Sequence, residues 1–301
     1  MISSLDPSSA LFLANIDRVQ QTLAEANAQV SSGKKINVAS DAPDQIGSLL
    51  QLRANLQHNS QIQTNLSSAQ ADASAADSAI SSGISMMDSA LTLAEQGANG
   101  TQTSDVLTNL AQQVQSIQEQ MVGVSQTMVQ GRYIFSGDQM TSPAYTFNSS
   151  DLSTNPVLQL SSAPATYQVE DPAGGAFAAA QSAQQIFDNG SGSAFAALNN
   201  LRLALLSGNT TAITNAIAPI KQASTQLNTS LAFYGEVEDR IQSATAYAGN
   251  LNTQLQTQIS QTEDADVAQA AMQLTQSTTQ LQAAMQMQGK MPHSSLFDYL
   301  G

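Results

Sequence analysis

Apolar residues recur at alternating steps of four and three along most of the chain, and this rhythm constrains the fold more than any other feature. Such spacing places the side chains on one stripe of an α-helix, as in a coiled coil. The N-terminal stripe consists of Phe12, Ile16, Val19, Leu23, Ala26 and Val30. The C-terminal stripe consists of Val267, Ala271, Leu274, Thr278, Leu281, Met285 and Gln288. We therefore predict a long helix near each end of the chain.

The same rhythm predicts further helices between these two. It continues from Leu49 to Ala94, and one unbroken helix of roughly 50 residues would be about 75 Å long. After a turn at residues 96–104, Ser104 is expected to cap a third helix that runs to Met128 and forms an antiparallel hairpin with the second. The rhythm returns over residues 195–206, 211–231 and 237–259.

A different pattern occupies residues 131–190, where short runs rich in aromatic and β-branched residues alternate with Gly, Pro, Asn and Ser. This is typical of a small β-rich insert, in which residues 177–187 could form a helix. The predicted fold is mainly α, an elongated bundle of long helices formed by the N- and C-terminal thirds. Its expected parts are terminal coiled-coil helices (1–35 plus 265–301), a helical rod (36–140 plus 191–264) and an outer insert (141–190).

Composition excludes several functions. The 301 residues carry a formal net charge of −14, so nucleic acids and anionic membranes would be repelled. There is no Cys, which excludes disulfides and thiolate metal sites. No window holds the ~20 apolar residues that would span a bilayer, and the first residues are not expected to be a secretory signal peptide.

Catalytic chemistry is not indicated either. The two histidines, His58 and His293, cannot make a multi-histidine metal site, and neither lies beside a candidate nucleophile in the sequence. Residues 263–266, Glu-Asp-Ala-Asp, are similar to part of a calcium loop but lack its central Gly and distal Glu. A capped helix start explains them better. We predict no enzyme activity, metal or cofactor.

Residues 32–44 interrupt the helical rhythm and are expected to form an ordered loop between two helices. Gly33 suits the end of the first helix, because glycine adopts the left-handed conformation there. Ser40 or Asp41 is expected to cap the second helix, with Pro43 in its first turn. Lys34 and Lys35 add positive charge to the same loop.

Three segments carry a resemblance to a known family. Residues 30–44, VSSGKKINVASDAPD, and residues 263–268, EDADVA, resemble motifs of the bacterial flagellin superfamily. Residues 131–145, GRYIFSGDQMTSPAY, are similar to a motif of the hook-associated junction proteins within that superfamily, as is the ending SLFDYL at residues 295–300. The chain departs from the first motif at Ala42 and at residues 44–45.

The resemblance implies an extracellular structural subunit at the junction between the flagellar hook and filament, exported through the type III apparatus without a cleaved signal. It further implies a ring of subunits with the terminal helices in an inner tube. The implied partners are further copies of the chain, the hook-associated protein FlgK, flagellin and a FlgN-type export chaperone. The predicted assembly interface comprises Phe12, Ile16, Val19, Leu23, Val30, Val267, Ala271, Leu274, Leu281 and Met285. The predicted motif loop comprises Gly33, Lys34, Lys35, Ser40, Asp41 and Pro43.

Three alternatives remain at this level. The first is the filament flagellin itself, which differs in its partners. The second is a non-flagellar coiled-coil signalling protein, and the third is an exported adhesin or enzyme with its activity in the insert. Because the terminal stripes can be satisfied within one molecule only by pairing, we also hypothesise that both terminal helices are mobile in the free subunit and ordered in the assembly.

Overall fold

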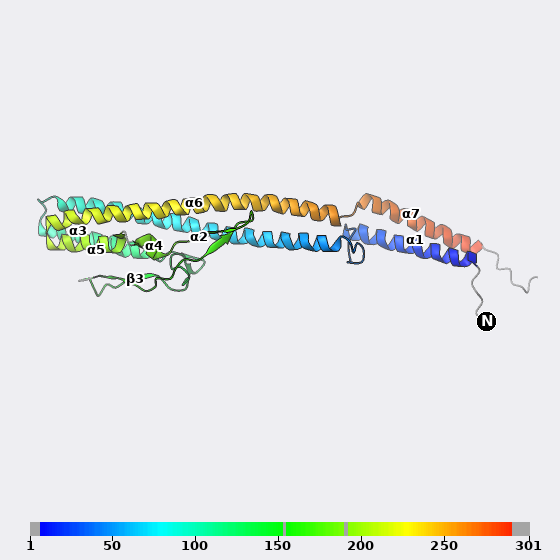
Figure 1. Ribbon diagram of the computed structural model, residues 1–301, viewed down its shortest axis with the longest axis horizontal. Coiled ribbons are helices and arrows are strands. Elements are labelled where there is room, and N and C mark those ends of the chain that lie inside the picture. Colours follow the sequence, from blue (N-terminus) through cyan, green and yellow to red (C-terminus); the bar gives the residue numbers. More distant parts are fainter. Residues whose placement is uncertain (1–6, 153–154, 190–191, 291–301) are drawn as a thin grey trace, which may run out of the picture. The chain divides into compact units, whose positions relative to one another are not determined.

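A computed structural model describes residues 7–152, 155–189 and 192–290 (Figure 1). The chain forms two compact units, a terminal unit within residues 1–58 and 252–301 and a central unit of residues 59–251. Two long helices, α2 (Ile46–Ala98) and α6 (Thr210–Glu263), contribute residues to both units. The predicted fold class, mainly helical with a small β-rich insert, is confirmed.

The terminal unit contains α1 (Pro7–Ser32) packed against α7 (Val267–Lys290). Helix α1 ends where predicted, because Gly33 adopts a φ of 71° and its N–H donates to the Gln29 carbonyl at 2.9 Å. Helix α7 has the expected acidic cap, since the Asp266 carboxylate accepts a hydrogen bond from the Gln269 N–H at 3.0 Å. The predicted end at Pro292 lies outside the described residues.

The start of α2 differs from the prediction. Neither Ser40 nor Asp41 caps it, and Pro43 precedes its first turn, because α2 begins at Ile46. The Asp41 carboxylate instead accepts hydrogen bonds from the N–H groups of Asn37 and Val38. A short polar side chain can accept hydrogen bonds from nearby backbone N–H groups in a turn as readily as at a helix start. Here Asp41 bonds within the turn and does not cap α2.

In the central unit, α2, α3 (Ser104–Ser125), α5 (Ala194–Ser207) and α6 form the helical bundle (Figure 1). Helix α3 is capped by Thr103, whose hydroxyl accepts from the Val106 N–H, rather than by Ser104. It also ends before Met128. That residue belongs to β1, because the chain reverses through the left-handed residues Gln130 and Gly131.

The β-rich segment consists of antiparallel hairpins rather than one continuous sheet. Each pair joins two short strands: β1 (Met128–Val129) with β2 (Arg132–Tyr133), β3 (Tyr145–Phe147) with β4 (Val157–Gln159), β5 (Gln168–Glu170) with β6 (Ala176–Ala178), and β7 (Asp188–Asn189) with β8 (Gly192–Ser193). The helix considered for residues 177–187 is shorter than expected. Phe177 pairs with Val169 in the third hairpin, and α4 (Ala183–Phe187) starts only after a capping box made by Ser182 and Gln185.

An aromatic cluster joins these hairpins to the bundle. Phe135 lies edge-on to Phe187 with 5.8 Å between ring centroids, and Tyr145 lies 4.7 Å from Phe195 of α5. Phe135 also meets Tyr234 of α6 edge-on at 6.4 Å. Such pairs add about 0.5–1.5 kcal/mol each beyond the burial of their area. The insert is therefore part of the central unit and not a separate body.

Two other boundaries also differ from those predicted. The helical segments expected at residues 211–231 and 237–259 form one helix, α6, which passes through Pro219 and Gly235. The terminal unit extends to residue 58 and begins again at residue 252, rather than at residues 35 and 265. The reason is that the loop after α1 is bonded to the end of α6.

Candidate assembly surface

The loop after α1 is tied to the end of α6 by a buried carboxylate. The Glu263 side chain, only 3% exposed, accepts from the Arg53 guanidinium at 2.6 Å and forms an ion pair with Lys34. Burial alone would raise the pKa of Glu263, but the hydrogen bonds and charges of Lys34 and Arg53 outweigh it and hold the pKa below its ordinary value. Glu263 therefore stays charged and joins three segments.

Backbone hydrogen bonds reinforce this connection. The Lys35 N–H donates to the Glu263 carbonyl at 2.7 Å, and the Ala265 N–H donates to the Gly33 carbonyl at 2.9 Å. The Lys35 ammonium also donates to the Gln261 carbonyl at 3.2 Å. The loop and the α6–α7 connection thus form a short antiparallel bridge, which positions the ends of α1 and α7 next to each other.

Most of the motif loop faces solvent. Lys34, Lys35, Ser40, Asp41 and Pro43 are exposed and Gly33 is half-buried. Backbone hydrogen bonds from Val38 and Asn37 lower the pKa of Asp41, so its carboxylate holds the turn together while it is charged.

The α1–α7 pair is joined by a narrow seam. On α1, Ala26 is buried, and the five predicted interface residues of this helix (Phe12, Ile16, Val19, Leu23 and Val30) are half-buried. On α7 the covered residues are Ala270, Leu274, Ser277, Leu281 and Ala284. Small side chains therefore alternate with leucines along the α7 side of the seam.

The remaining predicted α7 residues lie beside the seam and are open to solvent. Val267 is 45% exposed and Met285 is 60% exposed, and Ala271 is also exposed. On the other flank, Phe12, Ile16 and Val19 line an apolar groove of about 280 Å³ together with Met287 and neighbouring α7 residues. Exposed apolar surface beside a helix seam is a site where another chain can pack, so the two flanks together are a candidate assembly surface.

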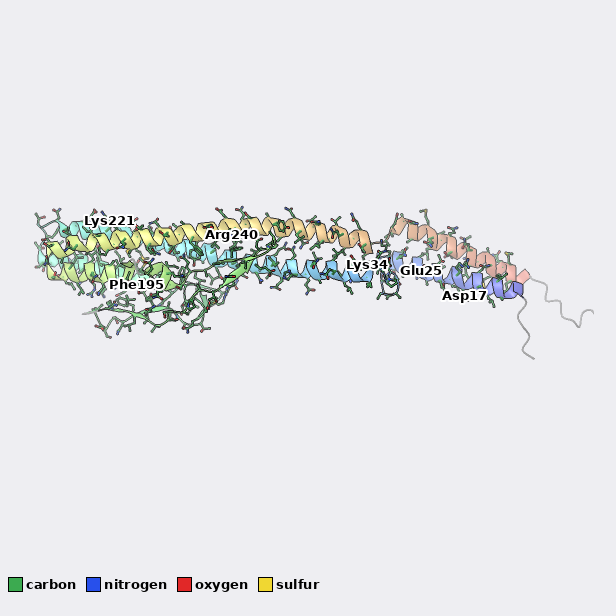
Figure 2. The ribbon with its side chains drawn as sticks, in the orientation of Figure 1. Asp17, Glu25, Lys34, Phe195, Lys221 and Arg240 are labelled. Carbon is green, nitrogen blue, oxygen red and sulfur yellow. The ribbon has the colours of Figure 1, made fainter. Side chains whose placement is uncertain are left out.

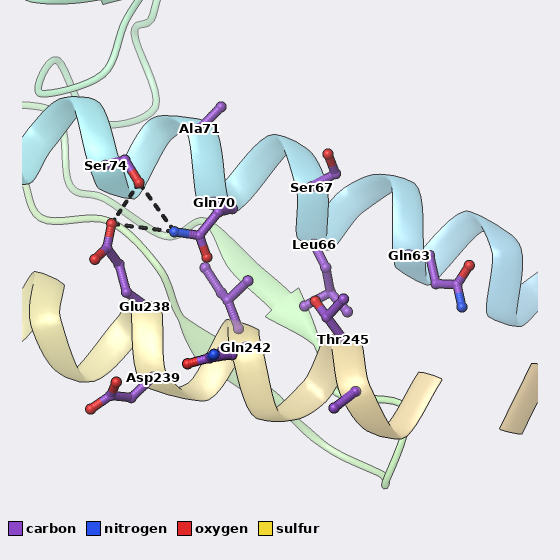
Figure 3. A pocket seen from close by; sticks show the side chains of 12 residues that line it. Gln63, Leu66, Ser67, Gln70, Ala71, Ser74, Glu238, Asp239, Gln242 and Thr245 are labelled. Carbon is purple, nitrogen blue, oxygen red and sulfur yellow. Dashed lines mark hydrogen bonds between the residues drawn. The ribbon is translucent and has the colours of Figure 1, made fainter. Parts of the chain in front are cut away.

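A second groove, of about 860 Å³, runs between α2 and α6 in the central unit (Figure 3). Its floor includes the buried side chains of Leu66 and Ile241. At one end Glu238 accepts hydrogen bonds from Ser74 at 2.6 Å and from Gln70 at 3.3 Å. Apolar side chains, amides, hydroxyls and carboxylates together line the groove.

Comparison with known proteins identifies the family. The model of the bacterial flagellin N-terminal helical region matches residues 2–140, and the model of the C-terminal helical region matches residues 217–300. Together these ranges include both terminal helices, the motif loop and Glu263. The chain belongs to the bacterial flagellin superfamily. A structural role in the bacterial flagellum follows from this membership.

Solved structures share the fold of this flagellin-superfamily chain. FlgL from Bacillus cereus aligns with a TM-score of 0.57 at 16% identity, covering 71% of this chain and 100% of that one. FlgL from Xanthomonas campestris aligns with a TM-score of 0.61 at 14% identity, covering 69% and 99%. A Vibrio parahaemolyticus chain provisionally assigned as a flagellar hook-associated protein gives 0.65 at 15% identity, covering 74% and 100%. A search of curated proteins gave no match.

In the described part of this flagellin-superfamily chain, no helix is long and apolar enough to cross a membrane. Within the same residues, no three His, Asp or Glu side chains gather as metal ligands would. Of the two histidines, His58 lies on α2, and His293 falls outside the described residues.

Sequence reasoning missed two contacts that position the insert of this flagellin-superfamily chain. Arg132 of β2 forms an ion pair with Asp72 of α2 at 3.2 Å. Arg240 of α6 lies over the Phe177 ring of β6, 4.4 Å from its centroid, and Figure 2 marks Arg240 on its helix. Because arginine is rare in this chain, the positions of Arg132 and Arg240 could have indicated where charged side chains hold the insert.

Proposed function

We propose that this chain is the junction subunit between the flagellar hook and filament, a role of the FlgL type. The observation that carries the proposal is the likeness of its fold to two FlgL structures over 99–100% of their lengths. The segment at residues 131–145 adds support, because Phe135 and Tyr145 within it are buried and anchor the insert. Filament flagellin is the alternative, since it belongs to the same superfamily.

Assembly is proposed to use the terminal unit. The stripe residues Phe12, Ile16, Val19, Leu23 and Val30, with Leu274 and Leu281, would form the inner seam of each subunit. Val267, Ala271 and Met285 would contact a neighbouring copy on one flank, because they are exposed beside that seam, and the groove lined by Phe12 and Met287 would be covered on the other flank. Repeated contacts of this kind would close a ring of subunits, with the terminal helices in its inner wall.

The remaining partners follow from the proposed place of the chain. The hook-associated protein FlgK would lie on the hook side and flagellin on the filament side, and a FlgN-type chaperone would bind before export. The subunit would be exported unfolded by the type III route without a cleaved signal, and it would act outside the cell. Its role would be structural and require no cofactor.

Deletion of the gene tests the junction role against filament flagellin. We expect electron microscopy to show hooks without filaments, with flagellin released into the medium, and we expect plasmid-borne wild-type gene to restore filaments. As a matched control, complementation with Tyr247→Ala tests an exposed residue of the central unit that belongs to neither proposed surface. Normal filaments in the deletion strain would refute the junction role. Long filaments grown from the purified chain alone would favour flagellin.

We further propose that weak pairing of α1 with α7 prevents premature assembly. In the terminal unit the described buried apolar residues are few: Ala26, Ile36, Leu49, Leu255 and Ala270. A helix pair with so little buried area should open often. Hydrogen exchange of the purified monomer should therefore be fast in α1 and α7 and slow in the bundle of the central unit. Strong protection of both terminal helices would contradict this proposal.

A further inference from the structure

Helix α7 exposes methionines to an unusual degree. Met272, Met285 and Met287 are 67%, 60% and 64% exposed. In contrast, Met87 and Met121 are completely buried in the helical bundle. The described thioethers therefore differ widely in access to solvent, and the exposed ones other than Met128 lie on the helix that carries the candidate assembly surface.

The three exposed methionines of α7 face different directions. At about 100° per residue, Met285 and Met287 lie about 160° apart around α7, on opposite flanks of its seam with α1. Met285 shares its flank with Val267 and Ala271, whereas Met287 lines the apolar groove with Phe12. Met272 lies roughly opposite the seam by the same geometry.

We propose that Met285 and Met287 are oxidation sites at which a hydroperoxide switches off the assembly surface of the free subunit. The inference rests on the proposed function, because it assumes that neighbouring subunits cover these flanks. The thioether sulfur attacks the terminal peroxide oxygen, so an S–O bond forms and the O–O bond breaks. The sulfur loses two electrons to give a sulfoxide, and the departing oxygen takes up the proton released by the newly bound oxygen and leaves as water (for hydrogen peroxide).

The sulfoxide changes what each flank can bind. Methionine is a flexible apolar side chain that fits irregular contact surfaces, and its sulfoxide is polar and chiral. An oxygen that must be buried without a hydrogen-bond partner opposes association. Assembly would in turn protect the sulfurs, so the modification would discriminate between free subunits and those already in place.

The test starts with the full chain treated with hydrogen peroxide until about half of the exposed methionine is oxidised. Peptide mass mapping of the free protein should show Met285 and Met287 oxidising at least about tenfold faster than Met87 and Met121, because oxidation follows exposure. Similar oxidation rates at all four residues would overturn the assignment of Met285 and Met287 as oxidation sites. That outcome would not depend on whether the chain assembles as proposed.

The same partly oxidised sample is then mixed with hooks from the deletion strain, and bound and unbound chains are separated. Sulfoxide at Met285 and Met287 should be at least about fivefold depleted in the bound fraction, whereas sulfoxide at Met272 should be evenly distributed. Equal distribution at Met285 and Met287, or equal depletion at Met272, would overturn the switch. Failure of the unoxidised chain to bind hooks would instead count against the proposed function.

Variants provide the matched control. Met285→Leu combined with Met287→Leu keeps apolar side chains of similar volume that cannot accept oxygen, so hook binding should become resistant to peroxide. Met272→Leu should leave the sensitivity unchanged. Treatment of oxidised wild-type chain with methionine sulfoxide reductases should restore binding, and failure of that recovery would show that peroxide acts elsewhere.

Discussion

Replacing Glu263 with glutamine removes the buried charge that connects the motif loop to the end of α6. Loss of a fully buried ion pair costs about 3–5 kcal/mol, and loss of an exposed pair about 0–1 kcal/mol. Here the carboxylate is buried, but the Lys34 and Arg53 side chains are 47% and 46% exposed and can be hydrated after the substitution. We therefore expect a cost of about 2 kcal/mol, between those limits.

Hydrogen exchange at two amides measures this cost locally. The N–H groups of Lys35 and Ala265 cross the bridge between the loop and α6, and about 2 kcal/mol corresponds to a roughly 30-fold loss of their protection. Glu238→Gln is the matched control on the same helix, since Glu238 bonds only central-unit residues in the contacts described above. If Glu263→Gln changed the protection of both amides less than about threefold, the carboxylate would not be what holds the loop.

Three further predictions concern the pH dependence of the Glu263 contacts, the left-handed Gly137 and the ion pair between Asp72 and Arg132. Because folding lowers the pKa of the Glu263 carboxyl, the stability that this group contributes is present above its ordinary pKa of 4.5 and is lost as the pH falls through the folded pKa. Exchange of the Lys35 and Ala265 amides, followed from pH 7 to 3 and corrected for intrinsic exchange, should show loss of protection only in that acidic range. Glu263→Gln should abolish the change. Gly137→Ala should lower the free energy of unfolding by about 3 kcal/mol, measured by urea unfolding followed by tyrosine fluorescence. The reason is that Gly137 has a φ of 61° and a Cβ there would overlap a backbone carbonyl oxygen. Gly131 is also left-handed but has open space around it, so Gly131→Ala should cost only about 1 kcal/mol. Asp72→Asn should cost about 1 kcal/mol by the same assay, and an equal loss in a variant that already lacks Arg132 would show that their ion pair is not the cause.

The helices could be predicted because the three-four rhythm is a local property of the sequence. It located α1, most of α2, and α7. It divided α6 at residues 231–237, where Gly235 interrupts the pattern. The structure continues the helix because tertiary contacts override the weak local preference of glycine: Tyr234 is buried beside it and its hydroxyl accepts from the Gln181 N–H at 3.1 Å.

The position of the α7 seam was less predictable. The sequence pattern placed Val267 and Met285 on the α7 stripe by their spacing and did not include Ala270 or Ser277. In the structure the smaller residues are buried, since they allow the helix backbones to approach closely. Leu274 belongs to both the predicted and the observed stripes, so the prediction was displaced around the helix by a fraction of a turn.

Sequence reasoning could not connect Glu263 to its partners. Glu263 and Arg53 are separated by 210 positions, and no local pattern joins residues so far apart. The acidic segment was predicted to cap α7, and Asp266 does so, but Glu263 is the last residue of α6 and turns inward. At the level of the sequence, only the resemblance to the superfamily linked residues 30–44 with residues 263–268, because both resemble its motifs.

The two units bury very different kinds of surface. The central unit has a continuous core from Ile62 to Ala244 that includes the aromatic cluster, whereas α1 and α7 are joined by a seam of small and half-buried side chains. Ordering a helix costs about 1–2 kcal/mol per residue in backbone entropy, and the narrow seam offsets less of it than the central core does. We therefore expect a stable central unit and terminal helices whose packing improves when further apolar surface covers their flanks. That difference is what a subunit needs if it must remain monomeric until it reaches its place and then become rigid there.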